Sequence, residues 1–213
     1  MPFPLVVFDF DGTLADSFAQ AVAIFRRIGP GLGLNPISDE EVPTLRTLPT
    51  KQFFKKVGIR FWRLPRVIRA YQAAAAEHAH ELKLHTGIAE MLAALHASGH
   101  RLGVLSSNRE DVIRACLRAN GVEELFAFVV GYPKLFGKAK ALRRILKAEG
   151  IDREQLLYVG DEVRDIEAAN KVKVPVVAAT WGFHARELLA AAGPTAFADT
   201  PADVLAAVTA SGS

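Results

Sequence analysis

Two aspartates one residue apart follow the first apolar run of the chain, in the segment Asp9-Phe10-Asp11-Gly12-Thr13. If the run is a strand, residues i and i+2 point the same way, so the carboxylates of Asp9 and Asp11 converge at its carboxyl end, where open α/β sheets bind ligands. Close carboxylates repel each other and invite a divalent cation, and hard oxygen ligands favour Mg²⁺. The segment therefore predicts a magnesium site, against the simpler alternative of a polar strand end with an Asp-Gly turn.

A second acidic segment, with Asp161, Glu162 and Asp165, follows another apolar run and opens a helical pattern. Asp161 lies at the predicted strand end, where its carboxylate can complete a metal site with Asp9 and Asp11. Glu162 and Asp165 are expected to support these ligands without binding the metal themselves. Asp165 would orient Asp161 or a metal-bound water. Taken alone, the segment is equally typical of a helix start that carries dipole-favoured acids.

Small polar residues end the strand expected near residue 105. Ser106, Ser107 and Asn108 combine hydroxyl and amide groups with the start of a helix, a combination suited to binding phosphate. Thr13, beside the paired aspartates, is a further candidate phosphate ligand. An ordinary helix cap is the competing interpretation of Ser107 or Asn108.

Lys138 opens another helical segment, and a cation there can neutralise paired carboxylates and hold a transferring phosphoryl group. Lys134 and Lys140 are close enough in sequence to take the same role. Lysines at helix starts are usually solvated, so this assignment depends on the other motifs.

Short apolar runs without polar alternation, separated by helical patterns, predict a parallel sheet covered on both faces. The expected strands are residues 5–10, 102–105, 126–130, 156–159, 174–179 and, more weakly, 195–198. The expected helices between them are residues 88–98, 111–119, 138–148 and 163–170. The fold class is therefore α/β, with a doubly wound, Rossmann-like parallel sheet.

About ninety residues separate the first two strands, far more than a usual crossover. This stretch contains helical patterns at 19–28, 50–57 and 64–82 and no convincing strand. We therefore expect residues 16–84 to form a helical cap inserted into a core of residues 1–15 and 85–213.

The net charge of +3 conceals an uneven distribution. Residues 44–76 contain eight basic and no acidic side chains, and the rest of the chain carries 18 basic and 23 acidic ones. The basic residues are Arg46, Lys51, Lys55, Lys56, Arg60, Arg63, Arg66 and Arg69. We expect some of them to face the Asp9 cleft, where they would attract an anionic substrate.

A single cysteine, Cys116, excludes an intrachain disulfide and fits a reducing compartment. The amino-terminal residues lack the features of a signal peptide, and no stretch approaches the roughly 20 apolar residues of a membrane span. We therefore expect a cytoplasmic protein with no membrane partner. The oligomeric state is not predicted.

The four motifs, in this order, resemble those of the haloacid dehalogenase superfamily: DxDGT, a Ser/Thr strand end, a Lys, and GDxxxD. The resemblance spans residues 5–165 and is closest to the phosphoglycolate phosphatase branch. It implies a sheet of order 5-4-1-2-3 with a cap after the first motif. The sequence departs from the family at Lys138, because the common Lys-Pro pair is absent.

The resemblance implies an Mg²⁺-dependent phosphatase of a small phosphorylated metabolite. Asp9 would attack phosphorus to form an aspartyl-phosphate, and Asp11 would act as general acid and then as general base. Mg²⁺ would be held by Asp9, Asp161 and the backbone carbonyl of Asp11, while Ser106 and Lys138 bind phosphoryl oxygens. A second aspartate at position 11 also excludes the metal-free dehalogenase branch.

Two alternatives stay open at this stage. A sugar phosphomutase of the same superfamily would use the same aspartates to return the phosphoryl group to a bound sugar. In another class, the basic stretch with its interleaved aromatic residues could form a nucleic-acid-binding module. Nucleic acid is the less favoured partner, because that interpretation leaves Asp9, Asp11, Asp161 and Asp165 unexplained.

Overall fold

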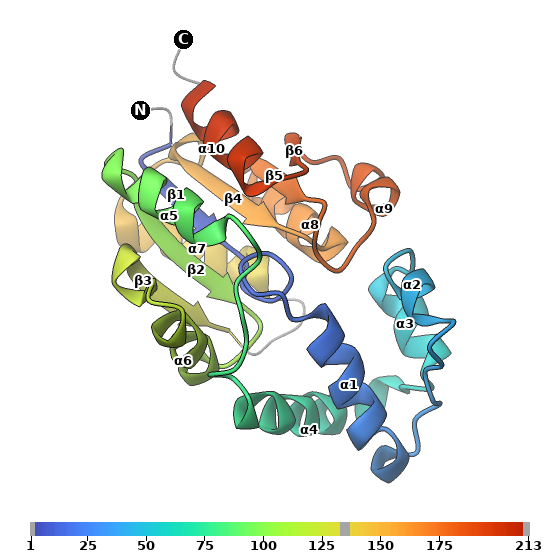
Figure 1. Cartoon of the computed structure of the whole chain (residues 1–213). Coiled ribbons are helices and arrows are strands. Elements are labelled where there is room, and N and C mark those ends of the chain that lie inside the picture. The colour runs from blue at the N-terminus through green and yellow to red at the C-terminus, as the bar shows by residue number, and fades with distance from the viewer. Residues whose placement is uncertain (1–2, 133–136, 211–213) are drawn as a thin grey trace.

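The computed structural model describes residues 3–132 and 137–210, which form one six-stranded parallel sheet flanked by helices (Figure 1). The strand order is β3-β2-β1-β4-β5-β6, and every neighbouring pair is parallel. The strands are β1 (Leu5–Phe8), β2 (Arg101–Ser106), β3 (Phe126–Gly131), β4 (Leu156–Gly160), β5 (Val176–Ala179) and β6 (Ala196–Ala198). The α/β fold class and the 5-4-1-2-3 order are confirmed, with β6 added at one edge.

Helices cover both faces of the sheet, which explains why the central strands are apolar along their whole length. All four residues of β1 are buried. One face packs against α5 (Ile88–Ala97), α6 (Glu110–Ala119) and α10 (Pro201–Ala210). The other face packs against α7 (Lys138–Glu149), α8 (Val163–Val172) and α9 (Arg186–Ala190).

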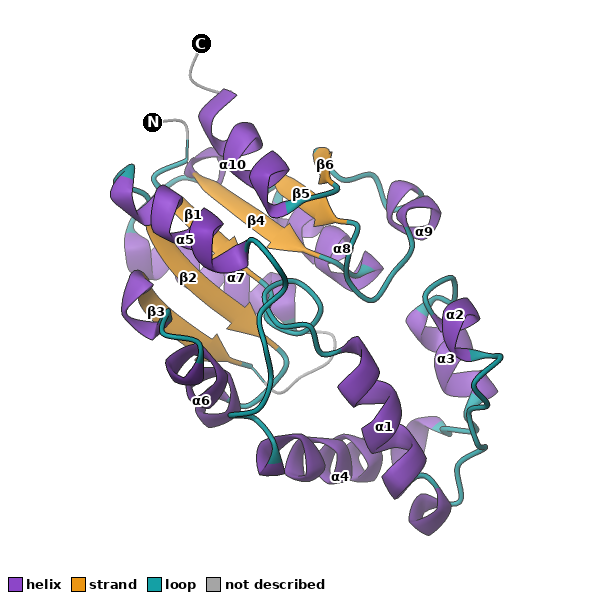
Figure 2. Cartoon of the chain, viewed as in Figure 1, coloured by secondary structure: helices purple, strands orange, loops and turns teal. Residues whose placement is uncertain are grey.

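A helical insertion between β1 and α5 lies beyond the carboxyl ends of the strands (Figure 2). It contains α1 (Phe18–Ile28), α2 (Val42–Leu45), α3 (Thr50–Lys56) and α4 (Leu64–Glu77), with an apolar cluster of its own. The two chain segments that join it to the sheet lie side by side. The Asp16 backbone amide donates a hydrogen bond to the Lys83 carbonyl, and Ala15 forms an isolated antiparallel β-bridge with Leu84.

The helix predicted over 64–82 is too long, because α4 ends at Glu77. The alanine-rich sequence continues the helical pattern, but the chain must turn at residues 78–81 to reach the sheet again. Tertiary packing here overrides local helix propensity. Among the described residues, no helix has the length and hydropathy needed to cross a membrane.

Candidate active site

Asp9 and Asp161 follow the neighbouring strands β1 and β4 directly, so the sheet itself brings them together. Both side chains are buried. Asp9 Oδ1 accepts a hydrogen bond from the Phe10 amide at 2.8 Å. Asp161 accepts one from Thr13 Oγ1 at 2.6 Å and one from the Phe183 amide at 2.7 Å. These bonds hold each carboxylate in one orientation.

Lys138, the first residue of α7, inserts its ammonium between two carboxylates. Its Nζ lies 2.5 Å from Asp9 Oδ2 and also pairs with Asp165 Oδ1. All three side chains are buried. Of the other candidate lysines, Lys140 is exposed and Lys134 lies outside the described residues.

Asp165 is a positioning residue for this cluster. Besides Lys138, its carboxylate accepts a hydrogen bond from the Glu162 amide at 3.0 Å, which caps α8. The Tyr158 hydroxyl lies 3.5 Å from the same oxygen that faces Lys138. Asp165 therefore orients the lysine that contacts Asp9.

The carboxylates of Asp9, Asp161 and Asp165 form a group whose oxygens lie within 4.8 Å of one another. Lys138 balances only part of this buried negative charge. A set of hard oxygen donors with excess negative charge fits Mg²⁺ better than a softer metal. The Asp11 carboxylate is not in this group, and the predicted ligation through its backbone carbonyl stays a prediction.

Buried charges in this cluster shift the acidities of its members. Burial raises the pKa of Asp9 to about 7, with Lys138 opposing and Asp165 adding to the shift. Burial and the nearby Asp9 hold the pKa of Asp161 well above its ordinary value. Burial would also raise the pKa of Asp165, but the cations of Lys138 and Arg164 lower it.

These shifts predict that the metal-free protein loses stability as pH rises. A carboxyl whose pKa is raised by folding favours the folded state below its ordinary pKa of 3.8, and this contribution is lost as pH passes the folded value, about 7 for Asp9. Bound Mg²⁺ should cancel the loss, since it takes the place of the protons. Thermal unfolding in EDTA and in saturating Mg²⁺ should therefore diverge as pH rises from 5 to 8, by roughly 5 °C.

His85 and His184 act in the opposite direction, since burial lowers the pKa of both imidazoles. The variant Asp161→Asn isolates the carboxylate effect, because both histidines are unchanged in it. We expect its metal-free form to melt above the wild type at pH 8 and to show no Mg²⁺ shift. Equal Mg²⁺ shifts in the two proteins would contradict the assignment of Asp161 as a metal ligand.

Asp11 lies apart from the buried cluster and faces a cavity. It is half-buried, and its Oδ2 accepts a hydrogen bond from Asn108 Nδ2 at 3.0 Å. Burial raises the pKa of Asp11, and the bond from Asn108 opposes the rise. A raised pKa keeps the proton that a general acid must donate.

Gly12 allows the chain to turn between Asp11 and Thr13. Its φ is +77°, and a Cβ there would lie 2.2 Å from Asp161 Oδ2. Only glycine fits both the left-handed backbone and this close approach.

The predicted phosphate ligands surround the same sheet edge, but several have partners. The hydroxyl of buried Ser106 accepts a hydrogen bond from the backbone amide of Asn108 at 3.0 Å. The Ser107 hydroxyl accepts one from Arg164 Nη1 at 3.1 Å. Thr13 donates to Asp161, so its hydroxyl orients a candidate metal ligand.

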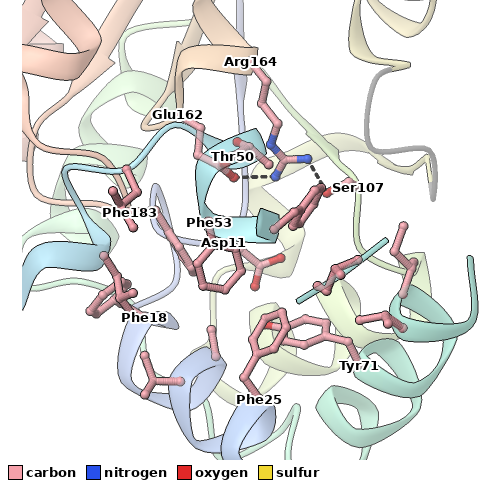
Figure 3. A pocket seen from close by; sticks show the side chains of 18 of the residues that line it. Asp11, Phe18, Phe25, Thr50, Phe53, Tyr71, Ser107, Glu162, Arg164 and Phe183 are labelled. Atoms are coloured by element: carbon pink, nitrogen blue, oxygen red, sulfur yellow. Dashed lines mark hydrogen bonds and ion pairs between the residues drawn. The ribbon is translucent and has the colours of Figure 1, made fainter. Parts of the chain in front are cut away.

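A cavity of about 210 Å³ separates the helical insertion from the sheet edge (Figure 3). Asp11, Ser107 and Asn108 lie on its core side. Aromatic side chains from the insertion, which include Phe25, Phe53 and Tyr71, line it as well. The cavity therefore adjoins the candidate general acid.

A family model described as haloacid dehalogenase-like hydrolase matches residues 6–179, which carry all four motifs. The chain belongs to the haloacid dehalogenase-like hydrolase family. It is 37% identical over 204 residues to the phosphoglycolate phosphatase of Synechococcus elongatus, covering 96% of each chain. It is 31% identical over 194 residues to the phosphoglycolate phosphatase of Agrobacterium fabrum, covering 84% of this chain and 82% of that one.

Solved structures show the same fold. A haloacid dehalogenase-like family hydrolase from Streptococcus pneumoniae superposes with a TM-score of 0.82 at 22% identity, covering 98% of this chain and 99% of that one. The family match and the curated relatives at 37% and 31% identity confirm the expectation of an enzyme, a phosphatase of this superfamily.

Arg164, which none of the sequence motifs singled out, also lies in this haloacid dehalogenase-like site. Its guanidinium lies on the cavity wall, pairs with Glu162 and donates to Ser107 (Figure 3). The position of Arg164 in the sequence could have indicated this role. A cation in the first turn of a helix interacts unfavourably with the helix dipole, so an arginine there is expected to have another partner. His184 Nδ1 accepts a hydrogen bond from the Val163 backbone amide at 3.0 Å, near the start of α8.

The basic residues of the insertion do not line the cavity, contrary to the expectation that some would face the cleft. Arg46 donates to the Thr180 carbonyl at 3.1 Å, and Lys56 pairs with Glu41 at 2.5 Å. The exposed members are Lys51, Lys55, Arg60, Arg66 and Arg69. The apolar and aromatic side chains form the interior of the insertion, so these exposed charges lie at its surface, while Arg46 reaches the core just after β5.

Proposed function

We propose that this protein is an Mg²⁺-dependent phosphomonoesterase that acts on a small phosphorylated metabolite through an aspartyl-phosphate on Asp9. The main support is the position of Asp9, which lies at the sheet edge, oriented by the Phe10 amide, with the Lys138 ammonium 2.5 Å from its Oδ2. A buried, oriented carboxylate beside a cation is suited to attack a phosphoryl group whose charge that cation offsets.

In the first half-reaction, an Asp9 oxygen attacks phosphorus while the bond from phosphorus to the ester oxygen breaks. Asp11 gives its proton to the departing oxygen, so that an alcohol leaves. In the second half-reaction, Asp11 takes a proton from a water molecule, whose oxygen attacks phosphorus and releases inorganic phosphate from Asp9. Asn108, bonded to Asp11, orients the acid and base for both steps.

Asp9, Asp161 and the backbone carbonyl of Asp11 would hold Mg²⁺, and Asp165 would support the site through Lys138. When bound, the ion offsets the negative charge of the phosphoryl oxygens. Ser106, Ser107, Asn108 and Lys138 would bind the oxygens that remain. We further propose that residues 16–84 act as a cap over a core of residues 1–15 and 85–213.

The substrate is proposed only at the level of a small phosphomonoester. The names of the relatives make phosphoglycolate the reference compound. A panel of phosphorylated metabolites and 4-nitrophenyl phosphate, assayed for released phosphate with Mg²⁺ and with EDTA, tests the proposal. We expect turnover with Mg²⁺ and a loss of more than about 100-fold in EDTA. Turnover of no ester, or equal rates in EDTA, would contradict it. Transfer of phosphate to a sugar would instead indicate the phosphomutase.

A further inference from the structure

The cavity between the insertion and the sheet edge is the place where the organic part of the substrate must lie, if the proposed function is correct. Asp11 lines this cavity, whereas Asp9 and Lys138 lie beneath it and are buried. The general acid must contact the ester oxygen that leaves. The carbon skeleton attached to that oxygen would therefore extend past Asp11 into the cavity, whose lining Figure 3 shows.

The walls of the cavity on the side of the insertion are mostly apolar, with Thr50, Tyr71 and Gln72 as the polar members. Phe25 holds an edge-to-face contact with Phe53, their ring centroids 5.2 Å apart, and a tilted contact with Tyr71 at 5.5 Å. Leu64 and Ile68 continue the same wall along the insertion. Cavities of about 150 Å³ lined by such side chains accept a benzene ring, so about 210 Å³ suffices for an aromatic ring or a branched alkyl group.

Several polar groups on the cavity wall already have partners among the other lining residues. Arg164 pairs with Glu162, and their side chains are both largely buried. Asn108 donates to Asp11, and Gln72 donates to the Ser107 carbonyl at 3.3 Å. Polar groups already satisfied in this way gain little from a polar leaving group.

The described residues that line this cavity offer few cations to a second anionic group on the substrate. Among the lining residues that the structure describes, Arg164 is the one lysine or arginine, and Glu162 offsets its charge. None of the eight basic residues of the insertion lies on the wall. A carboxylate placed there would lose its hydration without gaining a full ion pair.

We propose that the leaving group of the physiological substrate is an aromatic or branched aliphatic alcohol without a carboxylate. This proposal deepens the proposed function and rests on it. It predicts that a hydroxy-acid phosphate such as phosphoglycolate is turned over, but is a poor substrate compared with an uncharged apolar ester.

Matched esters test the proposal without a change in the chemistry of the leaving oxygen. We choose 2-phenylethyl phosphate and 2-(4-carboxyphenyl)ethyl phosphate, which differ only in a remote carboxylate, with phosphoglycolate as reference. For the uncharged ester, we expect kcat/KM at least about tenfold above that of either carboxylate. Ethyl, butyl and hexyl phosphate should rise in kcat/KM along the series, because each added methylene is buried.

A pair of variants on α4 supplies the structural control. Ile68→Lys places a cation on the cavity wall, and Ala73→Lys places the same cation on an exposed position outside it. We expect Ile68→Lys to shift the preference toward the carboxylate ester by about tenfold or more, and Ala73→Lys to leave the ratio as in the wild type.

Three outcomes decide the matter. A preference for the uncharged esters that Ile68→Lys reverses supports the proposal. Turnover of 4-nitrophenyl phosphate with phosphoglycolate or the carboxylate ester preferred would overturn it while leaving the phosphatase function intact. Failure to hydrolyse any of these esters, including 4-nitrophenyl phosphate, would overturn both.

Discussion

Replacement of Asp9 by asparagine should abolish phosphatase turnover. An amide oxygen is a poor nucleophile, so no aspartyl-phosphate can form, and the loss of a catalytic nucleophile costs on the order of 10⁴-fold or more in rate. Asparagine is close to aspartate in size, and the carbonyl oxygen of the introduced side chain can still accept a hydrogen bond from the Phe10 amide, so the fold should persist. Release of phosphate from 4-nitrophenyl phosphate with Mg²⁺ measures the effect.

The matched control is Asp16→Asn, an exposed carboxylate that makes the same chemical change outside the site. We expect wild-type turnover from this variant. Thermal unfolding of both variants separates a chemical defect from a folding defect. An Asp9→Asn enzyme that retains even a tenth of the wild-type rate would exclude Asp9 as the nucleophile.

Replacement of Lys138 by methionine should give a large loss of stability. Burial alone would lower the pKa of this ammonium, but Asp165 and Asp9 raise it, so the lysine stays charged and neutralises both. Its removal leaves two buried carboxylates without their cation, and such a loss typically costs about 3–5 kcal/mol. Chemical denaturation should show this decrease in the free energy of unfolding, and turnover should be lost.

A second substitution tests the cause of that loss. Asp165→Asn in the Lys138→Met background removes one of the stranded charges, so most of the lost stability should return while turnover stays absent. The exposed Lys140, changed to methionine, serves as the matched control and should unfold like the wild type. An unfolding free energy unchanged in Lys138→Met would show that the buried ion pairs do not matter for the fold.

The motifs could be predicted because each one depends on a local relation along the chain. Asp9 and Asp161 end apolar runs, and parallel strands bring such ends to one edge of a sheet. Their burial and their hydrogen bonds follow from that placement. Lys138 could be named as one of three lysines, but only the packing of α7 decides which ammonium reaches Asp9.

Features that depend on how distant segments meet could not be predicted. The pairing of Arg164 with Ser107 joins α8 to the end of β2, and no local pattern links the two. The same limit explains the mistaken expectation for the basic residues of the insertion. Charge counts along the chain do not say which side of a helix faces the sheet. In the insertion, aromatic side chains line the cavity and the basic side chains do not.

The most direct test of an aspartyl-phosphate on Asp9 is to find the phosphoryl group on the enzyme. Wild-type protein mixed with substrate and Mg²⁺ is quenched in acid, reduced with borohydride and digested for peptide mass spectrometry. Reduction of an aspartyl-phosphate converts that aspartate to homoserine. Nucleophilic catalysis by Asp9 predicts homoserine at position 9 and none in Asp9→Asn. Homoserine at another aspartate, or none during demonstrated turnover, would contradict nucleophilic catalysis by Asp9.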